Sequence, residues 1–379
     1  MSEYQYYEFQ AIDRPLSDEE MGELRSYSTR ARITRMSFVN DYSWGSFKGD
    51  ADAWMEKYFD AFLHLTNWGT HIVKLRLPSG LLDLKTAQEY CGGDCASVHE
   101  EADKVIVSFI SEDEEGGEWV EGEGILDSMI AVRTELARGD LRALYLGWLL
   151  LTQAGELGDE TPEPPVPPGL GELSASLDSL AEFLRIDGSL LRVAAYASAS
   201  LKEVEPERDE LDAWVAKLPT SEKDELLASL IMNADHAPLT KLLHRFLKQR
   251  SPGRCPAPAP RRTVGELRQA AETHAKEKQR VEAEKRAMDK ADRERKAAIA
   301  REKHLDGLTG SESKLWTEVD SLIATKLPKS YDRAAEVLID LRALDARAGG
   351  GHFLLRLEAL RQAHARKPSF TKRLDRAGL

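Results

Sequence analysis

The sequence has few cysteines and no long apolar run. Its 379 residues include three cysteines, and this odd, small number argues against a disulfide framework and favours a reducing compartment. The most apolar stretch, residues 144–151, is far shorter than the roughly 20 residues that cross a bilayer. The first residues lack the basic and apolar regions of a signal peptide. We therefore expect a soluble cytoplasmic protein that has no membrane partner.

Motifs that hold nucleotides or catalytic groups are also missing. There is no Gly-x4-Gly-Lys-Ser/Thr loop, and no Gly-x-Gly-x-x-Gly loop follows a predicted strand. Residues 45–49 depart from the Gly-x-Ser-x-Gly spacing of a nucleophile elbow. After His99, Asp103 stands where a zinc protease has its second histidine. These absences favour a protein without enzymatic activity.

Charge is divided unevenly along the chain. The net charge is −13, but residues 1–253 carry 24 Lys and Arg against 46 Asp and Glu, whereas residues 254–379 carry 28 against 19. This asymmetry predicts an acidic body and a basic arm. The arm suits nucleic acid, an acidic protein partner or the body itself. The alternative is that both charged surfaces are simply solvated.

The first part of the chain alternates predicted strands and helices. Runs rich in aromatic or β-branched residues predict strands over 4–11, 31–43, 71–77 and 105–110. A capping box from Ser17 to Glu20 predicts a short helix, and the spacing of apolar residues predicts further helices over 50–67, 125–137 and 140–154. The last of these is apolar on nearly every side and should be buried. Residues 1–156 therefore predict an α+β domain with one sheet and helices on one of its faces.

The rest of the chain is predicted to be mainly helical. Proline content, helical periodicity and charge divide it into a proline-rich linker over 157–172, a helical bundle or repeat-like segment over 173–250, a second linker over 251–262, a long charged helix over 263–307 and a C-terminal helical segment over 311–379.

The predicted long helix is rich in Ala, Glu, Lys and Arg and contains acid–base pairs four residues apart. Residues at seven-residue spacing from Leu267 are too polar for a strong coiled coil. A helix that is polar nearly all round is expected to be a solvated spacer, or to dock through its alanines. Its partner would then be another protein or a second copy of the chain.

Cys91, Cys95 and His99 are the candidate metal ligands, because thiolates and imidazole suit zinc. Zinc normally takes four such ligands, and Cys255 lies in a predicted linker far along the chain. The alternative is a turn with two ordinary thiols, which Gly92-Gly93 supports. We otherwise expect no cofactor. An acidic loop over 112–123 is read as solvated or, as a more distant alternative, as docking to the basic arm.

The C-terminal segment is the best candidate for contact with nucleic acid or a protein partner. Its last stretch, residues 366–376, is basic and contains one aromatic residue, and these properties favour phosphate contact and base stacking. The candidate residues are Arg366, Lys367, Phe370, Lys372 and Arg373.

Four segments, spread over most of the chain, resemble a family of uncharacterised bacterial cytoplasmic proteins: Asp140-Leu-Arg-Ala-Leu-Tyr-Leu-Gly-Trp148, Glu163-Pro-Pro-Val-Pro-Pro-Gly-Leu170, Phe183-Leu-Arg-Ile-Asp187 and the ending from Lys367-Pro-Ser-Phe370 to Leu379. The ending is also similar to the C-termini of some bacterial proteins with a SWIM-type zinc finger. The Cys-x-Cys and Cys-x-His pairs of that finger are absent here. The resemblance implies a bacterial cytoplasmic origin and transfers no active site.

Three hypotheses on function follow. The leading one is a non-enzymatic adaptor or scaffold that mediates protein–protein interaction through its helical segments. The second is association with nucleic acid through residues 264–379. The third is a hydrolase or nuclease-like enzyme in residues 1–156, in which His64, His71 or His99 would meet carboxylates.

Overall fold

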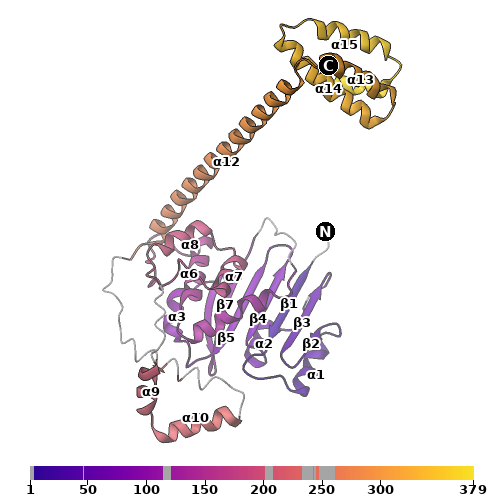
Figure 1. The fold of residues 1–379 in the computed structure, drawn as a ribbon. Coiled ribbons are helices and arrows are strands. Elements are labelled where there is room, and N and C mark those ends of the chain that lie inside the picture. Colours follow the sequence, from indigo (N-terminus) through magenta and orange to yellow (C-terminus); the bar gives the residue numbers. More distant parts are fainter. Residues whose placement is uncertain are drawn as a thin grey trace. The chain divides into compact units, whose positions relative to one another are not determined.

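The computed structural model describes residues 4–45, 47–113, 121–200, 208–232, 242, 245–246 and 261–379. The chain forms two compact units, Met1–Glu277 and Lys278–Leu379 (Figure 1). Among the described residues, no helix is both long and apolar enough to cross a membrane. Cys255, most of the second predicted linker and the middle of the acidic loop lie outside the described residues.

An antiparallel sheet of seven strands organises the first unit. The strand order is β2-β3-β1-β4-β5-β7-β6. The strands are β1 (Gln5–Gln10), β2 (Arg32–Ile33), β3 (Ser37–Tyr42), β4 (Ala61–Thr66), β5 (His71–Pro78), β6 (Ala96–Glu101) and β7 (Lys104–Ser111). The prediction of an α+β domain with a single sheet is confirmed.

Helices α1 (Asp18–Tyr27) and α2 (Ala51–Lys57) cover one face of the sheet, called here the aromatic face. The predicted capping box is present: Ser17 caps the backbone of Glu20, and the Glu20 side chain bonds the Ser17 backbone. Below these helices, rings of Phe9, Phe38 and Trp54 pack with centroids 4.9–6.0 Å apart. Such clusters of aromatic side chains bury large apolar areas and fix their own geometry.

The opposite face, called the helical face, lies under a larger layer of helices. These are α3 (Leu84–Tyr90), α4 (Ile125–Met129), α5 (Ala131–Ala137), α6 (Arg142–Ala154), α7 (Ala175–Phe183) and α8 (Gly188–Ala195). Helix α6 is buried along almost its whole length, as its sequence predicts. Since helices cover both faces, the expectation of helices on only one face is wrong.

Residues 50–67 do not form one helix. Helix α2 ends at Lys57, and β4 follows from Ala61. Both faces of β4 are buried, with Phe62 on the aromatic face and Leu63 and Leu65 on the helical face. A strand buried on both sides loses the alternation that identifies strands, so its apolar residues imitate helical spacing.

The proline-rich segment is packed into the first unit. Leu170 belongs to the core of the helical face, and Tyr90 donates a hydrogen bond from its hydroxyl to the Pro165 carbonyl at 2.7 Å. Helices α7 and α8 contribute to that same core. Residues 157–195 therefore complete the sheet unit. Helices α9 (Arg208–Ala216) and α10 (Thr220–Met232) follow in sequence within the first unit.

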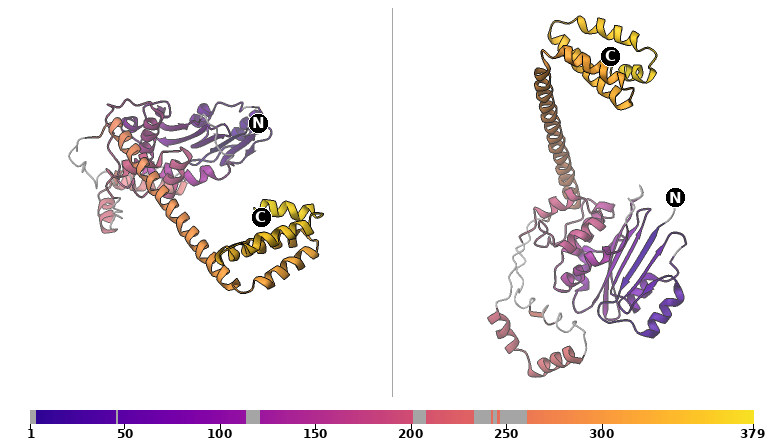
Figure 2. Two further views of the ribbon diagram at one scale, coloured as in Figure 1. Left: turned by 90° about the horizontal axis from the view of Figure 1, so that it is seen from above. Right: turned by 45° about the vertical axis from the view of Figure 1, so that its right-hand side comes forward.

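The 45-residue helix α12 (Val264–Leu308) confirms the predicted long helix. Four helices follow it: α13 (Glu312–Ala324), α14 (Pro328–Arg347), α15 (His352–Ala363) and α16 (Pro368–Arg376). They gather into one bundle, coloured yellow-orange in both views of Figure 2, around a core that includes Trp316, Leu338 and Phe370. The bundle confirms the predicted helical character of residues 311–379.

Candidate functional site

A group of buried and partly buried polar residues in the first unit holds the start of α12. Glu163 is 3% exposed. Its carboxylate accepts hydrogen bonds from Arg262 Nε and Nη2, each at 2.8 Å, and from the Tyr145 hydroxyl. Arg262 also donates from Nη1 to the Val193 carbonyl at 3.0 Å. A two-point contact between guanidinium and carboxylate is a strong, geometrically specific pairing.

The electrostatics of this group keep the ion pair charged. Burial opposes the charge of Arg262, but the Glu163 carboxylate outweighs that effect, so the pKa of the guanidinium is raised. Burial, followed by the Glu163 charge, raises the pKa of Tyr145, so its phenol remains a donor. Arg262 and Tyr145 therefore both have the ionisation states that their hydrogen bonds to Glu163 require.

Backbone contacts and apolar side chains complete the attachment. The Glu163 amide donates to the Arg262 carbonyl at 2.8 Å, and the Gly265 amide donates to the Asp159 carbonyl at 2.9 Å. A Cβ on Gly265 would lie only 3.1 Å from the Asp159 Cβ, so glycine permits this close approach. Val264 and Leu267, both fully buried, fill the core of the helical face. We call Tyr145, Asp159, Glu163, Arg262, Val264 and Leu267 the α12 seat.

Beyond the seat, α12 runs through a stretch that belongs to neither core. The last α12 residue in the first core is Ala271, and the first in the second core is Leu305. Every residue from 276 to 300 is exposed. Ion pairs four residues apart support this stretch, and each contributes little because its side chains are exposed to water. They join Lys276 to Glu272, Arg280 to Glu284, Arg286 to Glu282, Lys290 to Glu294 and Lys296 to Asp292.

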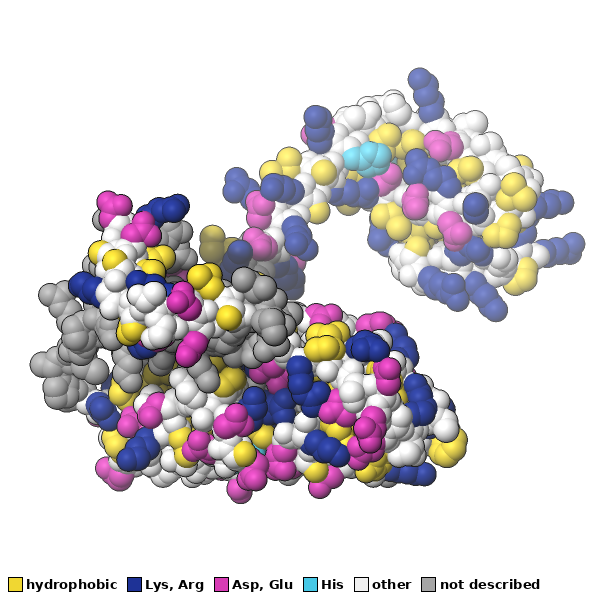
Figure 3. Space-filling view, turned by 90° about the horizontal axis from the view of Figure 1, so that it is seen from below, with side chains coloured by type: hydrophobic (Ala, Val, Ile, Leu, Met, Phe, Trp, Pro, Cys, Tyr) yellow, Lys and Arg dark blue, Asp and Glu magenta, His cyan; other side chains and the backbone are white. Residues whose placement is uncertain are grey.

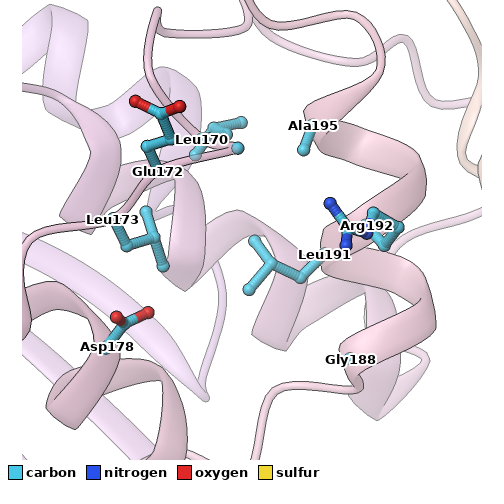
Figure 4. A pocket seen from close by; sticks show the side chains of 9 residues that line it. Leu170, Glu172, Leu173, Asp178, Gly188, Leu191, Arg192 and Ala195 are labelled. Atoms are coloured by element: carbon cyan, nitrogen blue, oxygen red, sulfur yellow. The ribbon is translucent and has the colours of Figure 1, made fainter.

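A pocket of about 310 Å³ opens between α8 and the segment that precedes α7 (Figure 4). Leu173 and Leu191 form its apolar part. Glu172 lies on the loop, Asp178 lies in the first turn of α7, and Arg192 lies on α8 (Figure 4). An apolar floor with polar groups of both signs is typical of a site for an aliphatic side chain of a partner.

A second cavity, of about 260 Å³, lies over β1 and β3. Here the Tyr6 hydroxyl donates to Glu8 Oε2 at 3.0 Å, and Gln10 Nε2 donates both to Glu8 Oε1 at 2.9 Å and to Asp127 Oδ1 at 2.7 Å. Burial raises the pKa of Glu8, and Asp127 adds to the effect. A buried carboxyl with a raised pKa in a cavity can hold a polar ligand or exchange a proton.

The predicted metal ligands lie in different environments. Cys91 is fully buried, with its thiol 3.7 Å from the Leu144 carbonyl, and burial raises the pKa of that thiol. Cys95 is half-buried, and burial together with Glu156 raises its pKa to about 12. His99 is exposed and lies opposite Ile106 in the register of β6 and β7, so it is on the same side of the sheet as the aromatic face. Both cysteines adjoin the helical face. Within the described ranges, no cluster of three or more Cys, His, Asp or Glu side chains could hold a metal ion.

The remaining candidate histidines are separated by the sheet. His64 stacks on Tyr7 of the aromatic face with ring centroids 4.2 Å apart, and burial lowers its pKa to about 4. On the helical face, His71 Nδ1 bonds the Phe183 carbonyl at 2.7 Å, and its Nε2 lies 3.0 Å from Arg185. Neither histidine lines the two cavities described above. His71 is held by its hydrogen bonds and His64 by its ring contacts, and the buried His64 Nε2 has no hydrogen-bond partner in the part of the chain that the structure describes.

The C-terminal candidates are only partly available to a partner. Phe370 is 0% exposed in the core of the second unit, so its side chain is not accessible to a partner. Lys367 donates to the Ile323 carbonyl at 3.2 Å, and Arg373 pairs with Asp332. Arg366 and Lys372 are exposed. The amphipathic pattern of α16 accounts for this division, because Phe370 and Leu374 lie one turn apart on its buried face.

The sequence does not predict the α12 seat, because its ion pair joins two proline-rich segments that composition predicts to be linkers. Glu163 and Arg262 are 99 positions apart. The one local signal is a single acidic residue inside a run of prolines. Comparison of the chain with family models, curated proteins and solved structures finds no match.

Proposed function

We propose that the protein is a non-enzymatic adaptor with two folded units connected through α12. The observation that supports this most directly is the continuity of that helix. Its first turns are part of the core of the first unit, and Leu305 is part of the core of the second. One helix therefore contributes side chains to the core of each unit.

The partner-binding site that we assign to the first unit is the pocket beside α8. Leu173 and Leu191 are partly buried and offer apolar contact, and Arg192 and Asp178 offer polar contact at the rim. On the second unit, Leu354 and Leu355 are 67% and 72% exposed. Large apolar side chains exposed next to one another are typical of surfaces that bind proteins.

Cross-linking of the tagged full-length chain in its native lysate, followed by mass spectrometry, tests this proposal. We expect cross-links from one partner to residues around the pocket, and we expect Leu191→Glu to remove them. The matched control is Leu227→Glu, which places the same charge at an exposed leucine of α10. A wild-type chain that forms no cross-links to another protein would overturn the adaptor proposal. An equal loss of these cross-links in both variants would overturn the assignment of the pocket as the partner-binding site.

The charge of the second unit favours association with nucleic acid as a second function. Residues 278–379 carry 23 Lys and Arg against 16 Asp and Glu. Lys and Arg side chains project from much of this unit, at the upper right of Figure 3. Fluorescence anisotropy with a labelled 20-base-pair duplex tests this function, because phosphate contacts weaken steeply between about 50 and 200 mM salt. Arg366→Glu with Lys372→Glu should weaken binding, and a salt-independent signal would exclude this function.

A further inference from the structure

Three apolar side chains form a line along the exposed part of α12. Val281 is 52% exposed, Met288 is 73% exposed and Ile299 is 59% exposed. An α-helix turns about 100° per residue, so spacings of 7 and 18 residues from Val281 bring all three within about 20° of one another. We call these residues the α12 stripe. Exposed aliphatic residues aligned on one side of a polar helix are typical of a helix-pairing surface.

The charges beside the stripe are sorted by sign. One flank carries Glu277, Glu284 and Glu302, and the other carries Lys278, Lys285, Lys296 and Lys303. Each of these positions lies about 40–60° from the stripe. Between Met288 and Ile299 the arrangement reverses, with Asp292 only about 20° from the stripe on the lysine side and Arg295 about 40° from it on the glutamate side. Each flank therefore has a nearly constant sign, except at this one polar layer.

We propose that the α12 stripe binds the α12 stripe of a second copy of this chain, with the two helices parallel. When two helices pair in parallel, the left flank of each faces the right flank of the other. Glu284 then faces Lys285 of the other copy, and Glu302 faces its Lys303. In the polar layer, Asp292 faces Arg295 of the other copy. Only Arg295 and Lys296 bring like charges together.

An antiparallel pair has the opposite electrostatic outcome. Like flanks then face each other, and Val281 lies beside Ile299 of the second helix. Lys278 meets Lys303, and Lys285 meets Lys296. Glu284 gains an opposite charge from Arg295 and Asp292 gains one from Lys285, whereas Glu277 meets Glu302. The sorted flanks therefore select the parallel arrangement, and this argument is independent of the adaptor proposal above.

Sedimentation velocity of the full-length chain over a concentration series tests the pairing. We expect reversible dimers, and we expect Met288→Glu to weaken association at least about tenfold, because it places two like charges at the centre of the stripe. The matched control is Ala297→Glu, at an exposed position about 160° from the stripe. It should leave association unchanged. A wild-type chain that is monomeric at every concentration would overturn the proposal.

Charge exchange tests the orientation. Glu284→Lys alone, or Lys285→Glu alone, should weaken the dimer, since each places like charges on facing flanks. The double variant E284K/K285E should restore it, because opposite charges face each other again in a parallel pair. Failure of the double variant to restore association, with helix content unchanged by circular dichroism, would overturn the parallel arrangement.

Disulfide trapping gives an independent measure of orientation. In a background with Cys95→Ser and Cys255→Ser, Val281→Cys should form a covalent dimer on mild oxidation, because position 281 faces itself in a parallel pair. Dimers that form only when the V281C chain is mixed with an I299C chain would show an antiparallel pair and would refute the proposal.

Discussion

Replacing Glu163 with Gln should loosen the attachment of α12 to the first unit. The side chain keeps its size, but the Arg262 guanidinium loses the carboxylate that lies 2.8 Å from both its Nε and its Nη2. Breaking a buried ion pair by removing one partner costs about 3–5 kcal/mol. The Arg262 side chain is 27% exposed, and water can reach part of it, so we expect the lower end of that range.

Thermal unfolding and hydrogen exchange measure this effect. For a unit of this size, about 3 kcal/mol lowers Tm by roughly 6–12 °C. Amides from 264 to 271 should exchange faster in E163Q, because the first turns of α12 leave the core more often. The matched control is Glu272→Gln, which removes an exposed ion pair with Lys276 and should leave Tm and amide exchange nearly unchanged. If E163Q and E272Q behave alike, the seat does not anchor α12.

Four further predictions concern individual buried groups. Arg76 helps to hold the pKa of Asp60 below its usual range, so the stabilisation that the Asp60 carboxylate contributes should be lost as pH falls below about 4. In urea melts over pH 3–7, this loss should be absent from the Asp60→Asn variant. The pKa of His64 is lowered to about 4, so unfolding free energy should rise with pH from about 4 to 6.5, and His64→Phe should flatten that rise. The raised pKa of Glu8 disfavours its charged form, so Glu8→Gln should be more stable than the wild type at pH 7, and the difference should shrink near pH 4.5. Phe370→Ala should destabilise the second unit by about 3–5 kcal/mol, measured by the exchange of its amides, whereas Leu355→Ala should have little effect.

Where one element has one buried face, its sequence predicts it well. The capping box at Ser17 and the alternation in residues 71–77 gave α1 and β5 close to their observed bounds. Prediction failed at β4, whose two buried faces hide the strand period, and at β6, a short edge strand with exposed acidic residues. Each failure follows from the strand's place in the sheet, which a local pattern does not record.

The α12 seat could not be predicted from the sequence for a different reason. Its strength depends on contact between Glu163 and Arg262, and composition assigns both to segments that usually form linkers. Proline prevents helix formation there but does not prevent burial. The extended backbone around Glu163 is what exposes an amide and a carbonyl for pairing with residues 262–264. The sequence pattern predicts helix α12 itself, but only the tertiary structure shows which residues its first turn contacts.

The position of the α12 seat also affects when the first unit can finish folding during synthesis. Glu163 leaves the ribosome well before Arg262, and the two are 99 residues apart. At about 5–20 residues per second, that interval lasts roughly 5–20 s. Val264 and Leu267 must arrive before the core of the helical face is complete. In a nascent chain that ends before residue 264, the apolar side chains that Val264 and Leu267 cover therefore stay exposed, and the core is completed only when the first turns of α12 arrive.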